Sequence, residues 1–311
     1  MTLVKWAIKS LVYYRRMNLA VVLATAVATA TLTGALLVGD SVKATLNYAF
    51  VSRLGDVDMA VSSQERFFTE DLSKRLKKND VNTAPVMQVR GMVTKGDGSI
   101  RVNQVRVLGV DERFFILSPA GVTPAGLENG KALVNSALAA RLKLPEESKE
   151  EIVLRIDNPS AISRNLVLAP HKDNTISMRL PVTGVADDEH FGRFSLEANQ
   201  QEPLNLFVPL AWLQKQIKRE GRANLLLADS PSQTSNTDEL TRLLKKAWRL
   251  EDAEAELLPG KEGSLELSSS RVFIDHSLEN GAFKARPDAL RLLTYFVNEL
   301  RVGDAFTPYS M

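Results

Sequence analysis

Cysteine is absent from the 311-residue sequence, and histidine occurs only three times. Without cysteine the chain can form no disulfide bond, thiolate nucleophile, iron–sulfur cluster or cysteine-ligated zinc site. With three histidines, a histidine-rich metal site is nearly excluded as well. We therefore expect a protein that holds neither a cofactor nor a metal.

An excess of charge of one sign is also missing, since 39 basic residues face 37 acidic ones. A nucleic-acid-binding protein carries a clear basic excess, so nucleic acid is not an expected partner. The balance hides one asymmetry, because residues 1–16 contain Lys5, Lys9, Arg15 and Arg16 and no acidic residue. The rest of the chain has 35 basic (39 minus 4) and 37 acidic residues.

Motifs of common enzyme classes are lacking too. The sequence contains no phosphate-binding loop, no H-E-x-x-H and no G-x-S-x-G. Residues 187–190 (DDEH) could ligate a hard cation, but they follow a predicted strand and precede Gly192, so a solvated turn is the preferred interpretation. Asp275 and His276 have no evident nucleophile to serve. We expect no enzymatic activity.

The most informative segment is an apolar run from Met17 to Gly39, which is 23 residues without a charge. As a helix it would span about 34 Å, enough for a hydrocarbon core of about 30 Å. The four positive charges precede it and Asp40 follows it. We therefore predict a transmembrane helix over 17–39, and the positive-inside rule gives it a cytoplasmic N-terminus with residues 40–311 outside.

The residues before this run predict a second feature of a membrane protein. Trp6, Tyr13 and Tyr14 are typical of an interfacial aromatic belt, and residues 3–14 read as a short amphipathic helix. We therefore expect residues 1–16 to form a cytoplasmic interfacial helix that contacts membrane lipids.

Two alternatives stay open for the apolar run. A cleaved signal peptide is one, because Ala24-Thr25-Ala26 or Ala26-Val27-Ala28 could serve as a cleavage site. Cleavage there would leave an apolar stump, and 23 residues is long for a signal sequence. A buried core helix is the other, and the basic flank and the aromatic belt argue against it.

Small residues recur along the predicted membrane helix at helical spacing. One stripe contains Ala20, Ala24 and Ala28, a second contains Ala26, Ala30 and Gly34, and a third contains Thr25, Thr29 and Thr33. Such stripes allow two membrane helices to approach closely. We predict that the six residues Ala20, Ala24, Ala28, Ala26, Ala30 and Gly34 pack against partner membrane helices.

The fold expected outside the membrane is mixed α+β. Residues 40–55 continue the helical pattern as a stalk that Gly55 ends. Strands are predicted over 57–63, 86–95, 99–110, 151–156, 179–187 and 204–210, with a hairpin turn at residues 96–98. A further strand enters a helix that either Asn135 or Ser136 caps. We divide this part into an outer βαβ-built subdomain (56–128 and 223–311) and a second subdomain inserted at 129–222.

An internal repeat supports the outer subdomain. Residues 69–78 (TEDLSKRLKK) and 237–246 (TDELTRLLKK) are identical at five of ten positions, and each follows a β run at the same distance. Capped amphipathic helices can converge on such a pattern independently. If the repeat is a duplication, its two helices should pack on the same sheet.

These segments together resemble a known family. The basic start WAIKSLVYYRR, a membrane helix ending in GALLVGDSVKATL, the strand LGDVDMAVSS and the segment KALVNSALAARLKL are similar to MacB/FtsX-type permease subunits of ABC transporters. The resemblance implies an extracytoplasmic core domain of MacB type that follows the first membrane helix, with residues 292–311 as its last strand. Three later membrane helices of such permeases have no counterpart here, so we expect a fragment or a truncated product.

The resemblance implies a non-enzymatic part of an ATP-driven machine in the plasma (inner) membrane, for export or for extraction of lipoproteins and lipids. Its expected partners are a cytoplasmic ABC ATPase subunit and other permease helices, with a dimer as the assembly. The rival interpretation is a single-pass, membrane-anchored binding module, and a third is a secreted protein after signal cleavage.

Overall fold

The computed structural model describes residues 3–64, 66–77, 81–145, 150–157, 175–197, 201–229, 237–260, 263–271, 273–292, 300–303 and 305–307. These residues form two compact units, one within residues 1–159 and 172–248, and one within residues 160–171 and 249–311.

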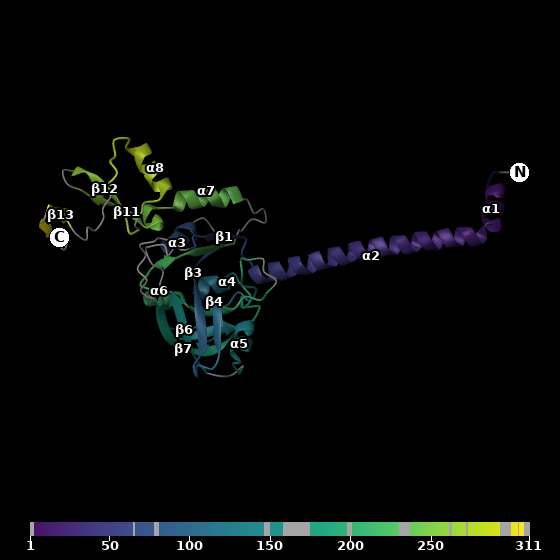
Figure 1. The fold of residues 1–311 in the computed structure, drawn as a ribbon, viewed down its shortest axis with the longest axis horizontal. Coiled ribbons are helices and arrows are strands. Elements are labelled where there is room, and N and C mark those ends of the chain that lie inside the picture. Colours follow the sequence, from purple (N-terminus) through teal and green to yellow (C-terminus); the bar gives the residue numbers. More distant parts are fainter. Residues whose placement is uncertain are drawn as a thin grey trace. The chain divides into compact units, whose positions relative to one another are not determined.

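The first unit begins with two consecutive helices, α1 (Leu3–Tyr13) and α2 (Arg15–Leu54). α2 runs for 40 residues without a break, about 60 Å at 1.5 Å per residue. The predicted membrane helix and stalk are therefore one continuous helix (Figure 1). Within the described residues, one helical stretch, Arg15–Tyr48, is long and apolar enough to cross a membrane, and none of its most apolar window is buried. A core helix covered by the rest of the described chain is therefore contradicted.

The remaining elements of the first unit alternate short helices with strands. They are β1 (Met59–Ser62), β2 (Phe68–Thr69), α3 (Asp71–Lys77), β3 (Thr83–Lys95), β4 (Arg101–Val110), α4 (Glu112–Ile116), β5 (Ala132–Asn135), α5 (Ser136–Leu142), β6 (Glu151–Asp157), β7 (Thr175–Ala186), β8 (Asn205–Pro209), α6 (Leu210–Gln216), β9 (Arg222–Ala223), β10 (Leu225–Ala228) and α7 (Thr237–Ala247). We call the part from β1 to α7 the body.

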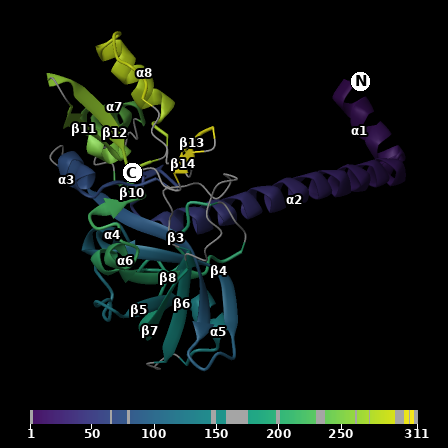
Figure 2. The same cartoon turned by 60° about the vertical axis from the view of Figure 1, so that its left-hand side comes forward.

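Six strands of the body close into a ring. Going around it, β3 pairs with β4, β4 with β8, β8 with β5, β5 with β7, β7 with β6, and β6 returns to β3 (Figure 2). The β4–β8 and β5–β7 pairs are parallel and the others are antiparallel. The predicted hairpin at residues 96–98 joins β3 to β4, and the register shifts between Gly91 and Val93. Closure leaves these strands with few free edges.

The period-two pattern of the strands sorts side chains between two cores. In β8, Leu206 and Val208 belong to the larger core, while Phe207 between them belongs to a second core that is rich in phenylalanine. In β4, Val107 faces the larger core and Leu108 the second one. Strands buried on both sides account for the near-continuous apolar runs of the sequence.

A smaller sheet, ordered β1-β10-β3, extends from the N-terminal half of β3. Helices α3 and α7 pack together at this sheet, where Leu72 and Leu76 of α3 share one apolar cluster with Leu226 of β10 and with Leu243 and Leu244 of α7. The predicted packing of the two repeat helices on the same sheet is confirmed.

The predicted boundary between the two subdomains does not coincide with a break in the strand pairing. β4, from the predicted 56–128 segment, pairs with β8, from the predicted 129–222 segment, so the ring of strands crosses the boundary between residues 128 and 129. β11 (Ala255–Pro259), which follows the second repeat helix, belongs to the second unit. The division at these residues stays a prediction.

The second unit contains small, local elements. η1 (Leu250–Ala253) precedes the β11–β12 hairpin, in which β12 is Leu265–Ser269. α8 (His276–Ala285) follows, and β13 (Leu300–Val302) pairs with β14 (Ala305–Thr307). The predicted last strand at 292–311 therefore corresponds to a two-stranded pair, with residues 293–299, 304 and 308–311 outside the described part.

Candidate functional site: the membrane helix and its junction with the body

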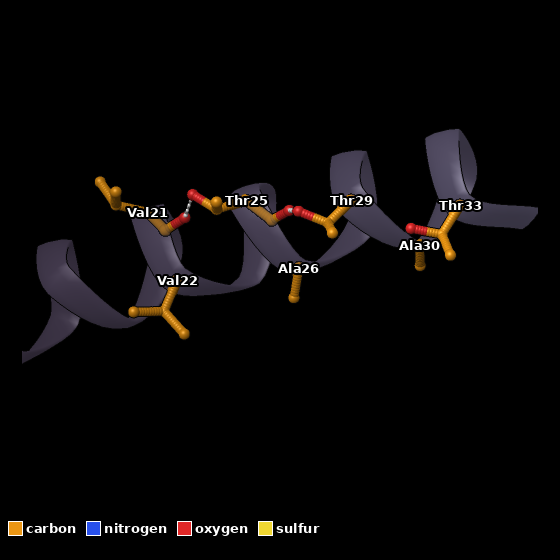
Figure 3. A pocket seen from close by; sticks show the side chains of 7 residues that line it. All are labelled: Val21, Val22, Thr25, Ala26, Thr29, Ala30 and Thr33. Carbon is orange, nitrogen blue, oxygen red and sulfur yellow. Dashed lines mark hydrogen bonds between the residues drawn. The ribbon is translucent and has the colours of Figure 1, made fainter.

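A shallow groove follows one side of α2 in its apolar part. It is lined by Val21, Val22, Thr25, Ala26, Thr29, Ala30 and Thr33. Figure 3 shows the three threonines along one edge, with Val22, Ala26 and Ala30 along the other. The groove thus combines the predicted threonine stripe with two members of the Ala26, Ala30 and Gly34 stripe.

Two of the three threonine hydroxyls along this groove are bonded within the helix. Thr25 Oγ1 donates to the carbonyl of Val21 at 2.7 Å, and Thr29 Oγ1 donates to the carbonyl of Thr25 at 2.8 Å. Because each of these hydroxyl protons is satisfied within the helix, the groove presents methyl groups and small side chains to its surroundings. Such a surface suits close packing of another apolar helix.

The Ala20, Ala24 and Ala28 stripe lies elsewhere on α2. Helical spacing places these residues on a different side from the threonines, and none of them lines the groove. The structure therefore brings only part of the predicted packing set together. The role of all six residues in packing stays a prediction.

The C-terminal end of α2 enters the core of the body. Leu54 packs against the phenylalanine-rich core, and Val57 is buried in it. Between them, Gly55 has φ +52°, and a Cβ at this position would lie 2.5 Å from the carbonyl oxygen of Leu117 and 2.8 Å from the ring of Phe191. Only glycine fits both the positive φ and the close approach.

Backbone hydrogen bonds fix the same junction. The amide of Asp56 donates to the carbonyl oxygen of Leu117 at 2.9 Å, and the amide of Asp58 donates to that of Ala228 at 3.1 Å. Leu117 ends α4, and Ala228 is the last residue of β10. The helix therefore joins the body through a fixed connection.

Aromatic rings support this connection from within. The rings of Phe114 and Phe191 have centroids 4.9 Å apart, and Phe194 lies 5.2 Å from both. Phe207 of β8 packs against Phe114 at 6.1 Å. Phe191 itself adopts φ +60°, so the turn that carries it needs external support.

Two buried amides supply that support. Asn135 Nδ2 and Asn205 Nδ2 each donate to the carbonyl oxygen of Gly192 at 3.0 Å. Asn135 Oδ1 also accepts the Leu138 amide at 3.0 Å, which makes Asn135 the N-cap of α5, one of the two caps predicted for this helix. Sequence reasoning missed the junction partners Leu117 and Phe191, and Gly55 after the last helical residue was the one available signal.

The acidic residues at 187–190 form the expected turn next to Phe191. The amide of His190 donates to Asp187 Oδ1 at 2.9 Å, and Asp188 pairs with Arg193 at 3.1 Å. Partial burial tends to raise the pKa of Asp187, but the hydrogen bonds and charge of His190 outweigh it, so its pKa is lowered. Over the ranges that the structure describes, no three His, Asp or Glu side chains gather in a way that could hold a metal ion.

Arg113 of α4 makes ion pairs with Asp111, the N-cap of its own helix, and with Glu70, which directly precedes α3. Its guanidinium contacts Glu70 at 2.6 Å and Asp111 at 2.5 Å. Desolvation lowers the pKa of Arg113, but the hydrogen bonds and charges of Asp111 and Glu70 outweigh it and the pKa is raised. A fully paired ion cluster of this kind is typical of a structural contact.

Residues 19–257 match the family model of the MacB-like periplasmic core domain. The chain belongs to this family. The family consists of permease domains of ABC-type transporters, which work with a cytoplasmic ATPase, and it is not a family of enzymes. The resemblance drawn from the sequence is thus confirmed, as is the mixed α/β fold with an N-terminal apolar helix.

Solved structures of such domains are similar to this chain at low identity. The periplasmic region of MacB from Actinobacillus actinomycetemcomitans is 11% identical, with a TM-score of 0.38 over 72% of this chain and 85% of that one. The extracellular domain of the noncanonic ABC-type transporter YknZ from Gram-positive bacteria is 11% identical, with a TM-score of 0.37 over 65% and 90%. No curated protein sequence matches the chain.

Proposed function

We propose that the chain is a permease subunit of an ATP-driven ABC transporter, acting in export or in extraction of lipoproteins or lipids. In this proposal α2 crosses the inner membrane, the N-terminus is cytoplasmic, and residues 40–311 are extracytoplasmic. A separate cytoplasmic ATPase hydrolyses ATP, and the chain passes the resulting movement to its body without doing chemistry of its own.

One observation carries the proposal: a single uninterrupted helix is apolar at one end and locked into a protein core at the other. The apolar span and the Leu54–Val57 junction belong to the same 40-residue helix and its cap. Because a helix is held by hydrogen bonds along its whole length, a displacement at the membrane end reaches the other end with little loss. The contacts of Gly55 and Asp56 with Leu117 then deliver it to the body.

The membrane end also supplies surfaces for partners. One helix cannot form a translocation path, because polar groups along a path must be shielded from lipid by other protein. In the proposal, the groove with Ala26 and Ala30 and the separate stripe with Ala20, Ala24 and Ala28 take two neighbouring helices, from the rest of the permease or from a second subunit of a dimer.

Assembly tests this proposal. Ala24→Leu and Ala30→Leu should each lower the amount of cytoplasmic ATPase that co-purifies with the permease, because a larger side chain blocks close helix contact. Membrane insertion should be unaffected, since leucine favours the bilayer by about 0.3–0.6 kcal/mol. Leu32→Ala, at an exposed residue that is neither among the groove residues nor among the six small residues, is the control and should assemble normally. Equal assembly of all three variants would contradict the proposal and favour the membrane-anchored binding module.

A further inference from the structure

The short helix α1 presents two different surfaces. Helical spacing places Val4, Ala7, Ile8 and Leu11 on one face, and all are exposed. Lys5 and Lys9 lie one turn apart beside this apolar face. The described part of the chain therefore leaves an amphipathic helix with an uncovered apolar side.

The link between α1 and α2 holds this helix close to the apolar span. Tyr14 interrupts the helical path between α1 and α2, and the amide side chain of Asn18 donates to the carbonyl oxygen of Leu11 at 3.2 Å. This bond satisfies a carbonyl that the interruption frees at the end of α1. With α2 spanning the bilayer from Met17, α1 has no connecting segment that would carry it away from the membrane surface.

The charges around this turn have one sign. Lys5, Lys9, Arg15 and Arg16 carry four positive charges, and the first acidic residue of the chain is Asp40, beyond the apolar run. Trp6 and Tyr13, exposed by 71% and 80%, flank the cationic side. Amphipathic aromatic rings of this kind favour the headgroup level of a bilayer.

We propose that α1 is a docking surface for anionic phospholipids of the cytoplasmic leaflet, with Lys5, Lys9, Arg15 and Arg16 binding their phosphates and the apolar face entering the acyl region. The inference rests on the proposed function for the orientation of α2, and it adds a lipid class as ligand. Charge complementarity favours lipid over a protein partner such as the ATPase, because no acidic residue accompanies the four cations to specify a mixed protein interface.

The absence of cysteine makes the test direct, since single cysteines can be introduced into the full chain without removing others. Nitroxide labels at Leu11→Cys (apolar face of α1) and Ser10→Cys (polar side) report depth and mobility in nanodiscs. The discs contain phosphatidylcholine alone or mixed with phosphatidylglycerol. A label at Val27→Cys reports separately whether α2 is inserted.

We expect the Leu11 label to lie deeper in the bilayer than the Ser10 label. The membrane-bound fraction of α1 should be larger in discs that contain phosphatidylglycerol. Lys5→Gln with Lys9→Gln should reduce the preference for anionic discs by about fivefold per charge removed. Two results would overturn the lipid proposal: equal membrane-bound fractions of α1 in the two lipids, or a Leu11 label that stays open to water until the ATPase is added. In either case a deep Val27 label leaves the proposed function intact. A water-exposed Val27 label would instead contradict the proposed function.

Discussion

The amide of Asp56 donates a hydrogen bond to the carbonyl oxygen of Leu117 at 2.9 Å, which joins the end of α2 to the end of α4. Gly55, one residue earlier, approaches the same carbonyl so closely that no side chain fits. The apolar helix is therefore attached to the body by backbone geometry and by burial of its last residues.

Gly55→Ala should destabilise the body by at least about 1–3 kcal/mol. The new Cβ would meet the Leu117 carbonyl oxygen at 2.5 Å, and the positive φ of +52° is itself strained for alanine. Denaturant unfolding, followed by the fluorescence of the body, measures the change.

Gly34→Ala and Gly121→Ala are matched controls. Gly34 lies in α2, where a Cβ would have no atom within 4 Å, and Gly121 has φ +65° with equally open space. The first should be neutral or slightly stabilising, and the second should show the cost of backbone strain alone. A Gly55→Ala cost no larger than that of Gly121→Ala would show that the contact with Leu117 is unimportant.

Asn135→Ala should cost about 2–4 kcal/mol of unfolding free energy. The change removes the N-cap of α5, worth about 1 kcal/mol. It also leaves the partly buried carbonyl of Pro203 and the buried amide of Asn205 without their bonds to Asn135, at about 1–3 kcal/mol. Asn103→Ala, at an exposed position of β4, is the control and should change stability by less than about 0.5 kcal/mol. Similar values for the two variants would refute the supporting role of Asn135.

Leu72→Ala should destabilise the β1-β10-β3 sheet by about 2–5 kcal/mol, because this side chain of α3 is fully buried in the apolar cluster against that sheet. Amide hydrogen exchange should also accelerate in α7, whose Leu243 and Leu244 pack on the same cluster. Leu257→Ala, at a half-exposed position of β11, should leave that exchange unchanged. Unaltered exchange in α7 of the Leu72 variant would show that the two repeat helices are not coupled.

Asp187→Asn should remove a pH-dependent stabilisation. The pKa of Asp187 is lowered from 3.8 in the folded state, so its charge stabilises the fold above the unfolded pKa, and this contribution is lost as the pH falls through the folded pKa. Because the side chain is largely exposed, the effect should be below about 1 kcal/mol. Asn keeps the acceptor for His190, which isolates the charge.

The measurement is the difference in unfolding free energy between the parent chain and the variant, taken at about pH 7 and at about pH 3. Asp188→Asn, which breaks the surface pair with Arg193, serves as a control of equal net charge. A difference that persists unchanged at low pH would contradict the electrostatic origin.

Local features of the fold could be predicted from the sequence, whereas long-range pairing could not. The charge-free run and unbroken period predicted α2, the Gly96–Gly98 turn predicted the β3–β4 hairpin, and Asn135 was one of the two caps proposed for α5, because each feature depends on neighbouring residues. Closure of the ring depends on the pairing of β6 with β3 and of β8 with β4. Apolar runs that are buried on both sides do not specify which strands pair. For this reason, the boundary predicted between residues 128 and 129 separates strands that belong to one ring.

The candidate site shows the same division. Small residues at helical spacing could be read directly, but the groove also needs Val22 and the inward-turned threonine hydroxyls, which depend on side-chain rotamers. The contact of Gly55 with Leu117 and Phe191 joins segments far apart in sequence, and the positive φ of Phe191 has no sequence signal.

The central claim, that α2 connects the cytoplasm to an extracytoplasmic body, is tested most directly by the sidedness of two single cysteines in intact cells. Ser10→Cys lies on α1 and Arg101→Cys is exposed at the start of β4. A membrane-impermeant maleimide should label Arg101→Cys in intact cells, whereas it should label Ser10→Cys only after the membrane is permeabilised. Labelling of both positions in intact cells, or of neither, would contradict the account.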